Sequence, residues 1–275
     1  MSRFPYTIAS RNGGCATLGL VVLQVDETIE QDFRRLFGAA DIAIHVSRVP
    51  SGAELTPDTI ATMEETLPAA AALLPPAARF DVIGYACTSG ATLIGSERVE
   101  ELVRGAADVH NVTNPMSAVC AALNALGARS VAIVSPYIES VARPVSAALA
   151  DAGFPTTASL SFGEEVEARV ARIDLASIRA AALEVGHRGD TGAVFLSCTN
   201  LRTLDLIDEL EAELGKPVVS SNQALAWHMA ELCGGLSFAS APGCLFRLRP
   251  CGCVQELAKR LSARAGWPDP ILGND

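Results

Sequence analysis

The chain has 275 residues, of which 49% are hydrophobic and 19% charged, and its formal net charge is −10. This composition excludes an intrinsically disordered protein, and the length predicts about two domains. A nucleic-acid-binding groove needs a positive field, so we expect no nucleic-acid partner for so acidic a chain. We expect no signal peptide, and no apolar run reaches the roughly 18 residues of a membrane span, so the sequence predicts a soluble, cytoplasmic protein.

Short apolar runs alternate with amphipathic segments along the whole chain. Strands are predicted at residues 19–23, 42–49, 80–86, 131–134, 157–162, 193–197 and 217–220. Helices are predicted at 28–37, after the Thr56-Pro57 cap, around 99–103, after Asn114-Pro115, at 138–149, around 175–185, at 204–214 and around 225–232. Strands that are apolar on both faces and alternate with helices predict parallel sheets covered by helices on both sides.

The two halves of the sequence repeat each other. The segment ending at Cys87 matches the segment ending at Cys198, an offset of 111 residues, and residues 19–23 match 130–134 at the same offset. We therefore expect an α/β protein of two pseudo-symmetric three-layer αβα units with parallel sheets and the active site in the cleft between them. Residues 1–115 with 222–275 would form the first unit, and residues 116–221 the second.

Polar residues follow the predicted strands, at the edge where parallel sheets bind ligands. Cys87 and Cys198 each lie between a strand and a helix, where free backbone N–H groups hold a carboxylate and lower a thiol pKa. Two such thiols from facing units would approach a substrate from opposite sides. One thiolate would remove a proton while the other thiol returns one, or one thiolate would add to an activated carbon.

The two cysteine segments resemble those of a known group of enzymes. Ala-Cys-Thr-Ser-Gly at 86–90 and Ser-Cys-Thr-Asn-Leu-Arg-Thr at 197–203 resemble the aspartate/glutamate racemase superfamily, in its maleate cis-trans isomerase and arylmalonate decarboxylase branch. The resemblance extends over residues 18–231. Within the branch, residues 22–30 look most like proteins encoded with ectoine utilisation.

This resemblance implies a catalytic pair, Cys87 as the nucleophile and Cys198 as its acid/base partner, with no metal and no organic cofactor. It also implies a homo-oligomer and a small carboxylate substrate. Decarboxylases of the branch lack the first cysteine, so racemisation or cis-trans isomerisation fits this chain better than decarboxylation.

The resemblance also implies a set of substrate-binding residues, which are Asp26, Thr88, Ser89, Tyr137, Thr199 and Asn200. Tyr137 matches a tyrosine that binds a substrate carboxylate. Asp26 stands where maleate isomerases carry an asparagine, and its charge would repel a carboxylate there. We therefore expect an amino-acid-like substrate with a cationic or amide group near Asp26. A loop around residues 164–172 usually contributes an asparagine, but this chain has none there and offers only Glu164, Glu165 and Glu167 in its place.

Plainer interpretations stay open for several of these residues. Asp26 could simply cap a helix, and Asn114 and Asn222 are both good helix caps. The cysteines near the C-terminal end lack the spacing of a zinc knuckle, so we expect no metal. The alternative functions are decarboxylation with Cys198 alone and binding of a small carboxylate without catalysis.

Overall fold

The computed structural model describes residues 3–8, 15–38, 41–53, 56–236, 238 and 241–248. Its strands are β1 (Ala16–Leu23), β2 (Ile42–Val49), β3 (Phe80–Ala86), β4 (Val109–Thr113), β5 (Val131–Ser135), β6 (Thr156–Ser161), β7 (Ala193–Leu196) and β8 (Val218–Ser220). Its helices are α1 (Ile29–Phe37), α2 (Pro57–Ala71), α3 (Thr88–Ile94), α4 (Ser96–Arg104), α5 (Pro115–Ala125), α6 (Glu139–Asp151), α7 (Glu167–Val170), α8 (Leu175–Gly186), α9 (Ile207–Leu214), α10 (Ser221–Leu232) and α11 (Cys244–Arg247). A 3₁₀ turn at Leu204–Leu206 precedes α9.

Two parallel sheets of four strands have the same strand order. The first runs β2-β1-β3-β4 and the second β6-β5-β7-β8. Strands β1, β5 and β7 are buried along their whole length, as is typical of strands in a sheet that helices cover on both faces. The predicted two-unit α/β architecture is therefore confirmed.

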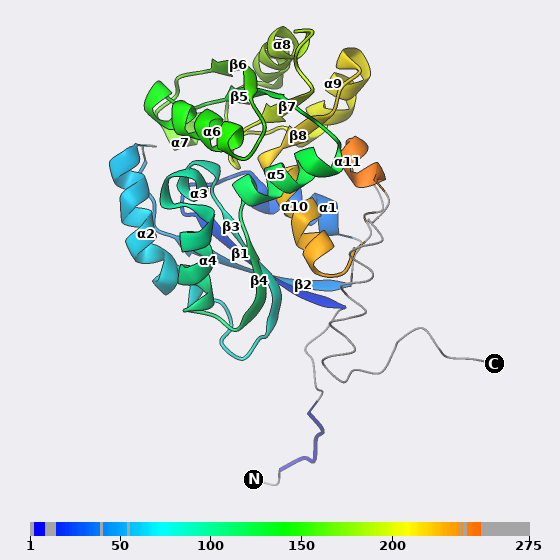
Figure 1. The fold of residues 1–275 in the computed structure, drawn as a ribbon. Coiled ribbons are helices and arrows are strands. Elements are labelled where there is room, and N and C mark those ends of the chain that lie inside the picture. Colours follow the sequence, from blue (N-terminus) through cyan, green and yellow to red (C-terminus); the bar gives the residue numbers. More distant parts are fainter. Residues whose placement is uncertain are drawn as a thin grey trace, which may run out of the picture.

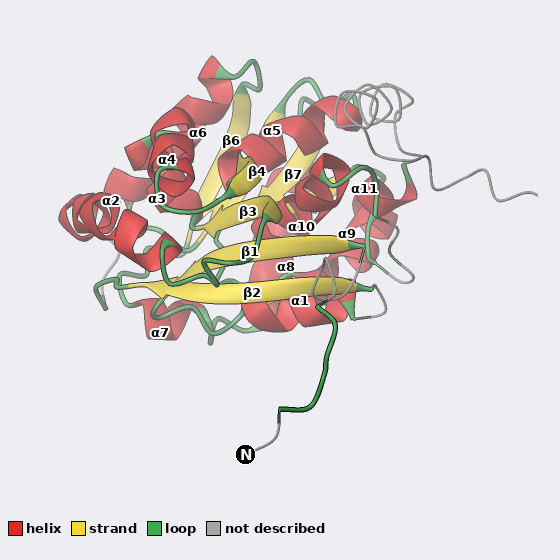
Figure 2. Ribbon diagram, turned by 90° about the horizontal axis from the view of Figure 1, so that it is seen from below, coloured by secondary structure: helices red, strands yellow, loops and turns green. Residues whose placement is uncertain are grey.

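The second sheet lies above the first in Figure 1, and α3, α5 and α10 lie between the two. Helix α10 follows the last strand of the second sheet and packs against α5, α1 and β3, on the side of the first sheet. In Figure 2, β1 and β2 run side by side at one edge of the first sheet, with helices on both sides of the strands. The carboxyl ends of β3 and β7 lie close together, since the hydroxyl of Thr199, shortly after β7, donates to the carbonyl of Ala86 at the end of β3, at 3.4 Å.

Several element boundaries follow from local chemistry. Thr56 forms the predicted cap of α2, in a capping box with Thr59. Asn114 accepts hydrogen bonds from the Met116 and Ser117 backbone N–H groups and caps α5.

The prediction that Asn222 also caps a helix is wrong. Ser220 caps α10 in a capping box with Gln223, and Asn222 lies inside the first turn. Its amide donates instead to Asp32 and to the Thr199 carbonyl, both at 2.8 Å. The two asparagines occupy similar sequence positions, but only the first precedes its helix.

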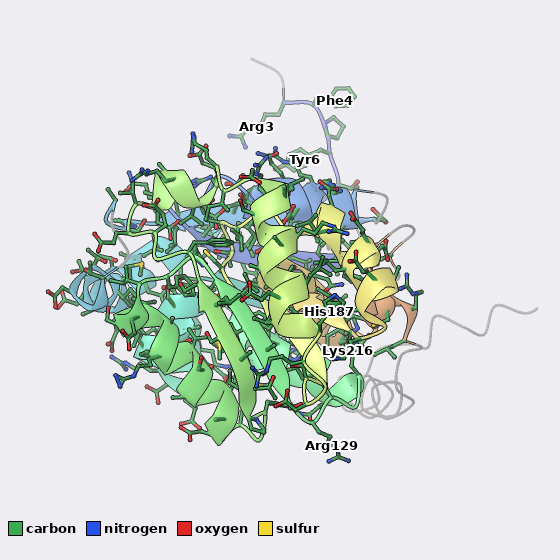
Figure 3. All side chains as sticks on the ribbon, turned by 90° about the horizontal axis from the view of Figure 1, so that it is seen from above. Arg3, Phe4, Tyr6, Arg129, His187 and Lys216 are labelled. Carbon is green, nitrogen blue, oxygen red and sulfur yellow. The ribbon has the colours of Figure 1, made fainter. Side chains whose placement is uncertain are left out.

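Four short elements, β4, α3, α7 and α11, were absent from the sequence-based prediction. Strand β4 has only five residues, three of them polar, and its alternation is too short to stand out. Helix α3 begins directly at Thr88, after the first cysteine. In the N-terminal segment, residues 3–8, the side chains of Phe4 and Tyr6 are exposed and lie outside the body of the protein (Figure 3).

Candidate active site

Cys87 occupies the junction between β3 and α3. Its thiol accepts a hydrogen bond from the Gly90 backbone N–H at 3.1 Å and lies 3.5 Å from the Ser89 hydroxyl. A Cβ atom at position 90 would lie 2.4 Å from the Tyr85 hydroxyl oxygen and 3.0 Å from the Cys87 sulfur. Glycine is therefore required here, because only a residue without a side chain lets the helix start so close to the thiol.

Cys198 follows β7 and is the only non-glycine residue in the described part of the chain with a positive φ, at 115°. Such a conformation costs about 1–3 kcal/mol for a residue with a side chain and persists only where its surroundings hold it. Here the Cys198 backbone N–H donates to the Ser221 hydroxyl at 3.0 Å. The strain is concentrated at a predicted catalytic residue, as is common at functional sites.

Hydroxyl groups connect the two cysteine loops. The Thr88 and Ser221 hydroxyl oxygens are 2.8 Å apart, so Ser221 joins the first loop to the Cys198 backbone. The Thr199 hydroxyl donates to the Ala86 carbonyl at 3.4 Å, from the second loop back to the first. Both threonines are thus engaged within the protein, and their substrate contacts stay predictions. The structure does bring the two cysteine segments together, as the sequence repeat predicted.

Asn200 holds three segments in place. Its amide nitrogen donates to the Glu167 carboxylate at 2.8 Å and to the Glu167 carbonyl at 3.1 Å, and its amide oxygen accepts from the Glu27 backbone N–H at 2.9 Å. The Asn200 carbonyl also accepts from the Thr28 hydroxyl at 2.9 Å. These bonds give Asn200 a positioning role, and its contact with substrate stays a prediction.

Asp26 does hold the start of α1, although it lies two residues before the cap position. One carboxylate oxygen accepts from the Thr28 and Ile29 backbone N–H groups, at 2.8 and 2.9 Å. The other oxygen is buried and has no hydrogen-bond partner. Burial raises the pKa of Asp26, while the N–H groups of Ile29 and Thr28, the nearby Thr199 hydroxyl and the Arg48 charge oppose that shift. The cap therefore uses half of the carboxylate and leaves the other half for a ligand.

Tyr137 lies after β5, beside both cysteines. It is 1% exposed, and its hydroxyl has no hydrogen-bond partner. Burial raises its pKa well above the ordinary value, and the nearby Cys198 and Cys87 thiols add to the shift. A buried hydroxyl without a partner is costly to the fold, which is consistent with a donor kept for a substrate carboxylate.

Glu167, at the first position of α7, is a buried acidic residue of the candidate site that sequence reasoning did not single out. Its side chain is 1% exposed, and its backbone N–H donates to the Ala53 carbonyl of the first unit at 3.1 Å. Burial raises its pKa to about 7, with the Asn200 bond opposing the shift and the Asp26 charge adding to it. Its own charge raises the pKa of both cysteines, so the carboxyl group lies near both thiols.

No sequence signal separates Glu167 from its neighbours. Glu164 and Glu165 lie on the same segment, and Glu165 is exposed. The expected asparagine of this loop is absent, and the structure puts the Glu167 carboxyl group near the thiols instead. Its burial depends on the contact with Ala53 and on the Asn200 amide, neither of which can be inferred from local sequence.

The prediction of low thiol pKa values is wrong. Burial raises the pKa of Cys87 to about 11 and that of Cys198 well above its ordinary value, and the Glu167 charge adds to both shifts. The Gly90 N–H does lower the pKa of Cys87, but less than burial raises it. Burial in the unliganded site therefore favours the neutral form of both thiols.

An open groove of about 430 Å³ lies next to this site, but neither cysteine lines it. Its wall includes Thr28, whose hydroxyl bonds Asn200, and Arg172, which forms an ion pair with Glu27 at 2.8 Å. The cysteines themselves are only 2% and 5% exposed.

The structure shows no metal centre in the part of the chain it describes: no group of three or more histidine, cysteine, aspartate or glutamate side chains could hold an ion. Cys251 and Cys253 lie outside the described residues. His187 is exposed at the outer surface near Lys216 (Figure 3). None of the described helices is both long and apolar enough to cross a membrane.

The model of the arylmalonate decarboxylase family matches residues 19–246, which is most of the chain and includes both cysteine loops. The chain belongs to this family. The arylmalonate decarboxylase of Bordetella bronchiseptica is 37% identical over 124 residues, which cover 45% of this chain and 52% of that protein. The match thus spans about half the length of this curated relative.

Maleate isomerases are relatives as well. The enzyme of Nocardia farcinica is 27% identical over 225 residues, 78% of this chain and 88% of that protein. The structure of a cysteine-to-serine mutant of the Nocardia enzyme, with a covalently bound succinylcysteine intermediate, has a TM-score of 0.75 at 25% identity and covers 85% of this chain and 99% of that one.

A liganded arylmalonate decarboxylase with one glycine changed to cysteine and one cysteine changed to serine has a TM-score of 0.76 at 28% identity. It covers 84% of this chain and 98% of that one. Membership of the family, and through it of the racemase-like superfamily, is therefore confirmed. The finer resemblance to ectoine-utilisation proteins stays a prediction.

Proposed function

We propose that this family member is a cofactor-independent isomerase in which Cys87 and Cys198 act on opposite faces of a small carboxylate. The observation that carries the proposal is the symmetric placement of the two thiols. Each follows the equivalent strand of its sheet, each is buried, and both lie near Tyr137 and Glu167. A single structural cysteine would need no such counterpart.

Two reaction courses fit this arrangement. In a racemisation or epimerisation, one thiolate takes the proton from the reacting carbon and the opposite thiol returns a proton to the other face. In a cis-trans isomerisation, one thiolate adds to the double bond, the carbon–carbon single bond rotates, and elimination restores the thiolate. The covalent cysteine intermediate of the Nocardia enzyme supports the second course in that relative.

The substrate that we propose is amino-acid-like, in keeping with a carboxylate at position 26. Tyr137 would donate to the substrate carboxylate, as its buried, unpartnered hydroxyl favours. A role in ectoine catabolism would fit a small amino acid or N-acyl diamino acid, and it rests only on the sequence resemblance of residues 22–30.

Incubation in heavy water tests the proposal directly. Wild-type protein is mixed with amino acids, N-acetyl diamino acids and maleate, and mass spectrometry follows deuterium uptake at the α-carbon together with the chirality or geometry of the product. We expect conversion of at least one compound. Cys87→Ser and Cys198→Ser should each lose it while keeping the wild-type circular dichroism spectrum.

Decarboxylation is the second candidate, and the 37% identity to the Bordetella enzyme favours it. In that reaction only Cys198 would be needed, to protonate the carbanion that remains after carbon dioxide leaves. Carbon dioxide release from a malonate derivative by the Cys87→Ser variant would support this function and contradict the two-thiol isomerase.

A further inference from the structure

The cysteine site carries buried acidic groups without a matching buried cation. Asp26 and Glu167 are 4% and 1% exposed, and no lysine, arginine or histidine is buried among the residues that the structure describes. The charge of Asp26 contributes to the raised pKa of Glu167, so the two carboxyl groups are close enough to oppose each other's ionisation. Two like charges in one desolvated site are unfavourable unless a cation joins them.

Arg48 is the basic side chain nearest to Asp26, and it is committed elsewhere. Its guanidinium donates to the carbonyl groups of Leu23 at 2.9 Å, Gln24 at 3.1 Å and Asp26 at 3.1 Å. It also forms an ion pair with Glu30. The guanidinium therefore binds the backbone of Asp26 rather than its carboxylate. Its charge lowers the pKa of Asp26, but by less than burial raises it, so the carboxylate is not fully compensated.

The unpartnered oxygen of Asp26 is independent evidence for a ligand. One oxygen already satisfies both N–H groups at the start of α1, so an asparagine would cap this helix equally well without a buried charge. The same holds for Glu167, because the Asn200 amide that bonds its carboxylate would bond a glutamine oxygen as well. Neither bond requires a negative charge, and a buried unpaired charge costs several kcal/mol.

We propose that Asp26 and Glu167 form an acidic subsite that binds an ammonium group on the reacting carbon of the substrate. The inference rests on the proposed two-thiol reaction and narrows its substrate class to α-amino acids, excluding acids without an amino group on the reacting carbon, such as maleate and the hydroxy acids. The charges of both carboxyl groups raise the pKa of Cys198, and the charge of Glu167 raises the pKa of Cys87 as well. The ammonium group would therefore lie next to the carbon that the two thiols reach.

Binding of an ammonium group would also prepare the thiols for reaction. The Glu167 charge opposes ionisation of both cysteines in the unliganded site. An ammonium group paired with Glu167 cancels that opposition and favours a thiolate when substrate is present. A substrate without a positive charge would leave both thiols neutral. Specificity and activation would thus depend on the same two carboxyl groups.

The test compares amino acids with hydroxy acids of the same shape in heavy water: aspartate with malate, and glutamate with 2-hydroxyglutarate. The variants are Asp26→Asn and Glu167→Gln, which keep the hydrogen bonds described above, and Glu165→Gln is the exposed control on the same segment. We expect wild type to exchange the α-proton of the amino acids only. Each site variant should raise KM for the amino acid at least about tenfold, as loss of a charged hydrogen bond does, and Glu165→Gln should match wild type.

Three results would overturn the inference. In the first, the wild-type protein exchanges the α-proton of the hydroxy acids as fast as that of the amino acids. This result would overturn the subsite but would leave the two-thiol reaction intact. Another is exchange of the amino acids with unchanged KM in both variants. If no compound is exchanged, the proton-transfer reaction fails, and calorimetric titration of wild type with aspartate and malate decides the subsite. Binding of aspartate alone, lost in both variants, supports the subsite, whereas equal binding of both compounds, or of neither, overturns it.

Discussion

The pH dependence of stability offers a direct check on the buried Glu167 carboxyl group. Its pKa is about 7 in the folded protein, against 4.5 for the same group exposed to water. The folded state thus holds this proton more tightly than the unfolded state. The protonated group therefore adds to the free energy of unfolding below pH 4.5, and this stabilisation is lost as pH rises through 7. The shift corresponds to about 3 kcal/mol in total, of which about 2 kcal/mol is lost between pH 5 and pH 8.

Replacing the carboxyl group by an amide removes this pH dependence while keeping the Asn200 bond. We expect Glu167→Gln to gain about 2 kcal/mol relative to wild type between pH 5 and pH 8. Urea denaturation of both proteins at the two pH values, followed by circular dichroism, measures the difference, and other titrating groups cancel in it. Glu165→Gln should show no such gain. A Glu167→Gln difference that is the same at both pH values would refute the burial of this carboxyl group.

Three further predictions concern the cysteine loops. Gly90→Ala should destabilise the protein by about 1–3 kcal/mol and slow turnover, because the new methyl group would clash with the Tyr85 hydroxyl and the Cys87 thiol. Thermal unfolding and initial rates measure both effects. A variant equal to wild type in both would show that the start of α3 is not packed this closely against Tyr85 and Cys87. Ser221→Ala should lower kcat more than it raises KM, since it removes the hydroxyl that joins Thr88 to the Cys198 backbone, and an unchanged kcat would mean that Cys198 keeps its conformation without Ser221. The rate of alkylation of Cys87 by iodoacetamide in the unliganded protein should still be rising above pH 9, because its pKa is about 11; a plateau near pH 7, measured by mass spectrometry of the labelled peptide, would contradict the neutral resting thiol.

The sequence was sufficient for the architecture because the relevant information is local and repeated. Apolar runs mark the central strands, and the common offset of the Cys87 and Cys198 segments predicts two similar units. Strand β4 escaped prediction because it is short and half polar. Asn222 was assigned a cap that Ser220 in fact provides, because sequence alone does not show which of three consecutive polar residues precedes the helix.

The chemistry of the site was less predictable, since it depends on burial and on contacts between distant segments. The thiols lie at turns with free N–H groups, which predicts a low pKa, yet complete burial reverses the direction. Glu167 becomes part of the site only through Ala53 and Asn200, which are far from it in sequence. Asp26 was recognised from its unusual residue type, but its unpartnered oxygen is visible only in the structure.

The central claim is that Cys87 and Cys198 serve opposite faces of one substrate. A single experiment tests it: each enantiomer of a substrate amino acid is incubated in heavy water with wild type, Cys87→Ser or Cys198→Ser, and deuterium uptake and enantiomer composition are followed together. The account predicts that wild type labels and interconverts both enantiomers and that each variant loses interconversion by at least about a thousandfold. Interconversion at a near-wild-type rate in either variant would contradict it.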